Sequence, residues 1–182
     1  VMPALDFARI AQEDGNDAKD GTLQLFSRLH HVNLDLDNSG EWIELGDGHR
    51  LWRLKIESPN ALALNVAFKN FYMPAGAEMH VYSEDRTHTI GAFTSINNRD
   101  HKSFATANVH DDVIFIEYFE PANVRGQGVI ALDYVGHCYR NITPRTAVAQ
   151  RADDCEVKVA CPEGEDYWDE RKGVVRIAGV SS

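Results

Sequence analysis

Short runs of alternating apolar and polar residues, separated by turn residues, fill the chain over residues 22–140. Within one run, Trp52, Leu54 and Ile56 alternate with charged residues. Comparable runs occupy residues 32–36, 41–45, 62–68, 78–82, 90–93, 113–119 and 128–135. Because successive side chains of a strand point to opposite faces, this pattern predicts short strands that each bury one face. Turns at intervals of roughly 8–12 residues are typical of a β-sandwich. We therefore predict an all-β fold, an antiparallel, jelly-roll-like sandwich over residues 22–140.

The first 21 residues do not follow this alternation, and we interpret them as a leader segment. Leu5, Phe7 and Ile10 are spaced so that they could line one face of a short helix. The polar run Glu13–Asp17 contains a glycine and is expected to end that helix.

The alternation also stops after Arg140. Residues 141–154 are mostly polar or small, without periodicity, and predict a linker of the kind that proteases cut. An acidic stretch follows, and then a last apolar run over residues 174–180. Since about 30 residues cannot bury a core of their own, residues 155–182 are interpreted as a fragment of a second domain.

The charge balance narrows the class of partner. The chain has 182 residues, with 28 Asp and Glu against 18 Lys and Arg, and a formal net charge of -10. Binding of nucleic acid phosphates needs a basic face, so we predict no nucleic acid partner.

No apolar stretch reaches the roughly 20 residues of a membrane-spanning helix, so we predict no membrane span. The chain starts without a secretion-signal pattern, and any such signal is expected to lie outside this sequence.

Motifs of common enzyme and metal sites are absent from the sequence, which has no nucleophile elbow, no phosphate-binding glycine loop and no metalloprotease helix. His30 and His31 are adjacent, but neighbouring strand residues point to opposite faces, which makes a shared metal site poor. Asp35–Gly40 resembles the start of a calcium loop, yet Gly46 stands where such a loop needs a glutamate. A hairpin turn explains the same residues. We predict no metal site and no cofactor.

Two other groups of residues have both a functional and a structural interpretation. His137 and Cys138 could suggest a thiol nucleophile, but no orienting partner lies nearby in sequence, so a buried, inert cysteine is predicted. Five aromatic residues could line a sugar-binding face, although aromatics at alternating positions more often belong to a core. They are Trp42, Trp52, Phe68, Phe71 and Tyr72.

Several segments occur in a distinctive order, over residues 40–42, 51–56, 61–68, 73–82, 114–121 and 135–140. Together they resemble the propeptide of bacterial secreted trypsin-like serine endopeptidases, in particular the lysyl endopeptidase family. The acidic pair Glu13-Asp14 is similar to a pair common in such propeptides. A second block, Cys155–Gly164 with the pattern Cys-x5-Cys-Pro-Glu-Gly, resembles the N-terminus of the mature protease. Val174–Ile177 is similar to the first strand of its β-barrel.

This resemblance implies that the chain is part of a zymogen. The catalytic His, Asp and Ser of the protease would lie downstream, so the chain itself has no catalytic residue and is not expected to hydrolyse peptides. Cys155 and Cys161 match cysteines that form disulfides with later cysteines of the mature protease. Cys138 departs from the family, where a small residue is expected.

The implied role of the sandwich is to assist folding of the protease domain of the same precursor and to inhibit it until the linker is cut. The precursor would be secreted or periplasmic, in a bacterium. Cleavage after Arg151 would place the new N-terminus just before Cys155, and Arg145 is the second choice. No lysine lies between Lys102 and Lys158, so autocatalytic release requires a protease that accepts arginine.

Two other functions stay open from the residues alone. The sandwich could be a carbohydrate- or protein-binding module of a secreted protein, or a structural domain without a ligand. The cysteine block and the arginine-containing linker favour the zymogen, because neither alternative needs them.

Overall fold

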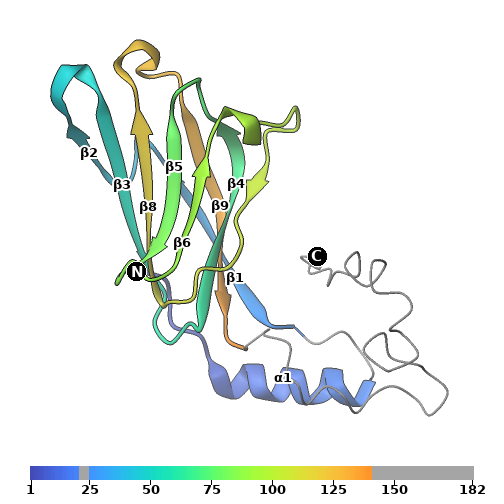
Figure 1. Cartoon of the computed structure of the whole chain (residues 1–182). Helices are drawn as coiled ribbons and strands as arrows, with labels where there is room; N and C mark the ends of the chain where they lie inside the picture. The colour runs from blue at the N-terminus through green and yellow to red at the C-terminus, as the bar shows by residue number, and fades with distance from the viewer. Residues whose placement is uncertain (21–24, 141–182) are drawn as a thin grey trace, which may run out of the picture. The chain divides into compact units, whose positions relative to one another are not determined.

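The structure, a computed structural model, describes residues 1–20 and 25–140. Residues 1–141 form one compact unit. Its elements are α1 (Phe7–Asp20), β1 (Ser27–Asp35), β2 (Glu41–Glu44), β3 (Arg50–Glu57), β4 (Ala63–Tyr72), β5 (Glu78–Ser83), β6 (Thr89–Phe93), β7 (Phe104–Ala105), β8 (Val113–Glu120) and β9 (Val129–Cys138) (Figure 1). In the described ranges, no helix is both long enough and apolar enough to cross a bilayer.

The strands form two antiparallel sheets that face each other (Figure 1). One sheet has the order β1-β9-β4-β7, and the other has the order β2-β3-β8-β5-β6. The chain crosses between the sheets at every connection except the hairpins β2–β3 and β5–β6. This is the topology of a jelly roll, with β2 as an additional strand beside β3. The predicted antiparallel β-sandwich is confirmed.

The hydrophobic core lies between the sheets and uses the side chains that the alternation predicted. On β3, Trp52, Leu54 and Ile56 are buried, whereas the charged residues between them are not. β3 pairs with β8, where Trp52 lies opposite Tyr118, and both side chains are fully buried. Burial of each large apolar side chain contributes roughly 1.5–3 kcal/mol, so this layer contributes a large part of the stability.

The turn at Asp35–Gly40 is present, but it joins strands of different sheets. Asp35 Oδ1 accepts hydrogen bonds from the backbone N–H groups of Asp37 and Asn38, each at 2.9 Å, which closes an Asx turn. The expected hairpin is wrong at this position, because β1 pairs with β9 and β2 pairs with β3. A turn at Gly46–Gly48 does close a hairpin, between β2 and β3.

Helix α1 runs from Phe7 to Asp20, so the prediction that Glu13–Asp17 ends it is wrong. Ile10 and Asp14 are four residues apart, which places them on one helix face, and both are buried. A glycine inside a helix costs only about 1 kcal/mol relative to alanine. The contacts of the buried face therefore outweigh the low helix propensity of this polar run.

Candidate functional site

The residues singled out in the linker and the tail lie outside the described residues. They are the processing candidates Arg145 and Arg151 and the cysteines Cys155 and Cys161, and the roles predicted for them stay predictions. The structure does describe the end of β9, from which the chain leads to these residues. We call the contacts of α1 with the end of β9 and with the two residues after it the exit junction.

Asp14 of α1 is the central residue of the exit junction. Its Oδ2 accepts a hydrogen bond from Arg140 Nη2 at 2.6 Å, and its Oδ1 lies 3.2 Å from the hydroxyl of Tyr139. The Asp14 side chain is only 6% exposed, so water screens its ion pair with Arg140 much less than it screens a surface pair. Burial, assisted by the Asp14 carboxylate, raises the pKa of Tyr139 and keeps its hydroxyl protonated. Helix α1 therefore holds the two residues that follow β9.

The neighbouring acid, Glu13, attaches α1 to β1. It forms an ion pair with Arg28 of β1, and its other carboxylate oxygen accepts from Arg9 Nε at 2.8 Å, one helical turn earlier. The two acids noted in the sequence thus bind different partners. Glu13 binds the first strand, and Asp14 binds the two residues that follow the last strand, which pairs with the first.

Two histidines lie beside the exit junction. His137 of β9 is fully buried, and its Nδ1 lies 2.8 Å from the hydroxyl of Ser58. The ring of His30 from β1 is edge-on to it, with centroids 6.1 Å apart, and the ring of Phe7 from α1 lies at the same distance. Within the described residues, the Nε2 atoms of both histidines are buried without a hydrogen-bond partner. His137 therefore has a hydrogen-bonding partner, Ser58, but the two residues are 79 positions apart in the sequence.

Burial lowers the pKa of both imidazoles below the ordinary value for histidine. For His137, the nearby His30 lowers the pKa further, while Asp112 acts in the opposite direction. Protonation of either ring would place a charge in a buried site without a hydrogen-bond acceptor for Nε2. Both rings are therefore held neutral in the folded protein at pH 7.

Acidification is expected to reduce the free energy of unfolding. The folded protein keeps His30 and His137 neutral, whereas the imidazoles of the unfolded chain bind protons as the pH falls below about 6.5. The stabilising contribution is complete above about pH 6.5 and is lost as the pH falls toward the lowered pKa values. Urea unfolding at a series of pH values between about 7 and 5 measures this slope.

The control for this measurement is the neighbouring histidine on β1. His137→Gln removes a titrating ring from the buried pair and is expected to flatten the slope. His31→Gln changes an exposed ring outside this pair, and its slope is the reference for the comparison. Equal slopes for the wild type and His137→Gln would contradict the assignment to this pair.

The structure brings together no metal site or reactive thiol from the described histidines and cysteine that the sequence singled out. His30 is turned to His137, while His31 is exposed and lies edge-on to Tyr134. Across the described residues, no group of three or more His, Cys, Asp or Glu side chains is arranged to hold a metal ion. Cys138 is buried as predicted, and burial raises the pKa of its thiol, which makes it a weak nucleophile at neutral pH.

The five aromatic residues considered for sugar binding do not share a surface. Trp52, Phe68 and Phe71 are fully buried, and Trp42 is partly buried against the core. Only Tyr72 is exposed. The core interpretation is therefore correct for four of the five, and this set forms no sugar-binding face.

A second candidate site lies on the outer face of the four-stranded sheet, where two β-bulges interrupt the pairing of β4 with β9. Lys69 on β4 and Asp133 on β9 each lack a partner in the register. On β9, the inward-facing residues Leu132 and Val135 are separated by two residues instead of one. Asp133 and Tyr134 consequently both reach the outer face, which a regular strand does not allow.

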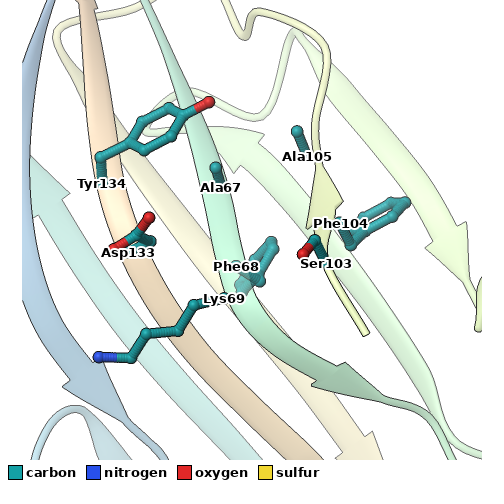
Figure 2. Close-up of a pocket in the computed structure, with 8 residues that line it drawn as sticks. All are labelled: Ala67, Phe68, Lys69, Ser103, Phe104, Ala105, Asp133 and Tyr134. Atoms are coloured by element: carbon teal, nitrogen blue, oxygen red, sulfur yellow. The ribbon is translucent and has the colours of Figure 1, made fainter. Parts of the chain in front are cut away.

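A shallow, open pocket of about 410 Å³ lies at these bulges, and we call it the sheet pocket (Figure 2). It is lined by Ala67, Phe68, Lys69, Ser103, Phe104, Ala105, Asp133 and Tyr134. Figure 2 shows Tyr134 and Asp133 on one side, Ser103 and Ala105 on the other, and the small side chain of Ala67 between them. Sequence reasoning missed this site, since its outer-face residues share no motif.

Two residues of β1 support the sheet pocket from the side. His31 lies edge-on to the ring of Tyr134, with centroids 6.4 Å apart. Asn33 Oδ1 accepts a hydrogen bond from Lys69 Nζ at 2.6 Å. An aromatic ring and a charged side chain of the pocket are thus each restrained by a neighbour outside it.

No known protein-family model matches this chain. Evidence about function therefore comes from the exit junction, the sheet pocket and the sequence motifs.

Proposed function

We propose that this chain is the prodomain, with the start of the mature enzyme, of a secreted bacterial trypsin-like serine endopeptidase. The sandwich assists folding of the protease domain and inhibits it until the linker is cut after Arg151 or Arg145. Support from the sequence comes from the two blocks that resemble that family, in the order propeptide and then mature N-terminus. Support from the structure comes from the exit junction.

The core of the sandwich and the exit junction both lie in residues that precede the proposed linker. The buried core cluster lies within residues 52–135. The last described residue, Arg140, is bound by Asp14 of the leader helix. Cleavage in the linker therefore removes none of these core residues and leaves the junction in place. A removable domain with its own core is what a folding assistant requires.

Folding assistance has a physical reason in this class of enzyme. A β-barrel protease forms many contacts between residues distant in sequence, so its folding is slow and exposed to aggregation. A prefolded domain upstream can present a surface on which the barrel forms, and its removal leaves a kinetically stable enzyme. Residues 1–151 contain 20 Asp and Glu against 14 Lys and Arg, so the prodomain suits a partner with a basic face.

Isolated residues 1–151 are expected to inhibit the mature endopeptidase and to increase the yield of active enzyme after its denaturation and refolding. Residues 1–140 retain the core and the exit junction but lack the linker, so they serve as the matched control. If the linker occupies the active-site cleft, the shorter fragment assists refolding without inhibiting. Peptide hydrolysis after refolding and in mixtures measures both effects.

The position of the cut is a second readout of the same proposal. N-terminal sequencing of the mature enzyme released from its precursor should give a start at Ala152 or, for the second choice, at Thr146. A start outside residues 146–154 would contradict the assigned linker. The prodomain role itself would be refuted if neither fragment inhibited the enzyme or increased the refolding yield.

A further inference from the structure

We infer that the sheet pocket binds one ring of a neutral, hydroxyl-rich saccharide, with Tyr134 as the platform on which the ring lies. This activity goes beyond the proposed prodomain role and does not depend on it. The inference rests on the side chains that the two bulges bring to the outer face and on the support that β1 gives them.

The bulge on β9 provides the apolar part of the site. It places Tyr134 beside the small side chain of Ala67, with Ala105 on the far side of the pocket, so that space is left beside an aromatic surface (Figure 2). The C–H face of a pyranose is apolar and packs well on such a ring. The pocket of about 410 Å³ has the volume of a small-molecule site and is open, which suits one unit of a longer chain.

The polar residues provide the complementary hydrogen bonds. Asp133 accepts only, Lys69 donates only, and the hydroxyl of Ser103 does both. A sugar hydroxyl is itself a donor and an acceptor, so it can be bound by any of these three groups. Because the lining has one ammonium group and one carboxylate group, its formal charges cancel. That balance favours a neutral ligand over a phosphate or a peptide of high charge.

The position on the sheet face favours a saccharide over a peptide strand. A peptide that extends a sheet binds to backbone groups at the edge of the sheet. The sheet pocket lies over the central strands β4 and β9 and extends to the short edge strand β7, which contributes Phe104 and Ala105. Apart from the bulge residues Lys69 and Asp133, the residues of β4 and β9 at the pocket pair with each other, so a ligand over these strands is recognised mainly by side chains. Support of Tyr134 by His31 and of Lys69 by Asn33 reduces the ordering cost of binding.

The experiment uses the full chain and four neutral probes, namely cellohexaose, xylohexaose, mannohexaose and chitohexaose, each titrated while NMR shifts or heats of binding are recorded. At least one probe is expected to bind, and Tyr134→Ala is expected to weaken that binding about tenfold. Tyr134→Phe keeps the ring and should bind as the wild type does. Asp133→Asn should weaken binding with little change in shape.

Tyr72→Ala is the matched control, because Tyr72 is exposed on the same sheet but does not line the pocket. It should leave the affinity unchanged. Circular dichroism and thermal unfolding of every variant separate a loss of binding from a loss of fold. The inference is overturned if none of the four probes binds at millimolar concentration, or if binding is unchanged in a folded Tyr134→Ala protein.

Discussion

Replacing Glu120 with alanine is expected to lower the free energy of unfolding by about 3–5 kcal/mol. This is the usual cost of removing one partner of a buried ion pair. The Glu120 side chain is fully buried, and Arg50 Nε lies 2.5 Å from its Oε2. The substitution would leave Arg50, which is only 17% exposed, without its carboxylate partner.

Glu120 also binds groups of two other kinds. The hydroxyl of Tyr118 donates to its Oε1 at 2.9 Å, and the backbone N–H groups of Gly126 and Gly128 donate to it at 3.0 and 3.3 Å. Burial alone raises the pKa of Glu120, but these hydrogen bonds and Arg50 outweigh it, so its pKa lies below the usual range. Loss of the carboxylate would leave several donors in the core unsatisfied, which is why the expected effect is large.

Urea unfolding of the full chain measures this effect, with Glu84→Ala as the matched control. Glu84 also forms an ion pair, with Lys55 at 3.0 Å, but both side chains are about half exposed. Surface pairs of this kind contribute about 0–1 kcal/mol. Similar losses of unfolding free energy in the two variants would contradict the large contribution expected of Glu120.

Gly40→Ala is expected to destabilise the fold by about 2–5 kcal/mol, for two separate reasons. Gly40 has a φ of +65°, which L-residues with a side chain rarely adopt. A Cβ atom there would also lie 2.6 Å from the carbonyl oxygen of Arg53 and 2.7 Å from Trp52 Nε1. Neither neighbour can move easily, because Arg53 belongs to β3 and Trp52 is a core residue that donates to Ser39 O at 2.8 Å.

Three other glycines separate these two reasons. Gly126→Ala introduces only the unfavourable φ, at +79° with no atom near the new Cβ, and should cost about 1–2 kcal/mol. Gly128→Ala introduces only a clash, with the new Cβ 1.9 Å from the Tyr118 hydroxyl at the end of a side chain, and should cost about 1–3 kcal/mol. Gly46→Ala introduces neither and should stay within about 0.5 kcal/mol.

Thermal and urea unfolding of the four alanine variants should therefore place Gly46→Ala nearest the wild type and Gly40→Ala farthest from it. A Gly40→Ala protein as stable as Gly126→Ala would mean that the chain relaxes around the new methyl group. That result would contradict the close packing of the turn between β1 and β2 against β3.

Strands could be predicted because each one buries a single face, which leaves a local period in the sequence. On β3 this period identified Trp52, Leu54 and Ile56 as core residues without any knowledge of the partner strand. The leader helix was predicted less well. Its polar second half, which contains Gly15, has low propensity, and it stays helical because Ile10 and Asp14 are buried.

Neither candidate site has a comparable local signal. The exit junction depends on Asp14 and Arg140, which are 126 positions apart. The sheet pocket depends on bulges, and a bulge is a relation between two strands. One clue existed on β9, where the buried Leu132 and Val135 are three positions apart, a spacing that a regular strand does not allow for two core residues.

The class of fold and the inner face of most strands therefore follow from the sequence, because side-chain alternation is a property of the single strand. The sequence also provided the motifs behind the prodomain proposal. The tertiary structure alone decided which strands pair, that Asp35–Gly40 crosses between sheets, and which polar residues meet at the exit junction and the sheet pocket. Those contacts join residues far apart in the chain, and they form only when the two sheets close over a common core.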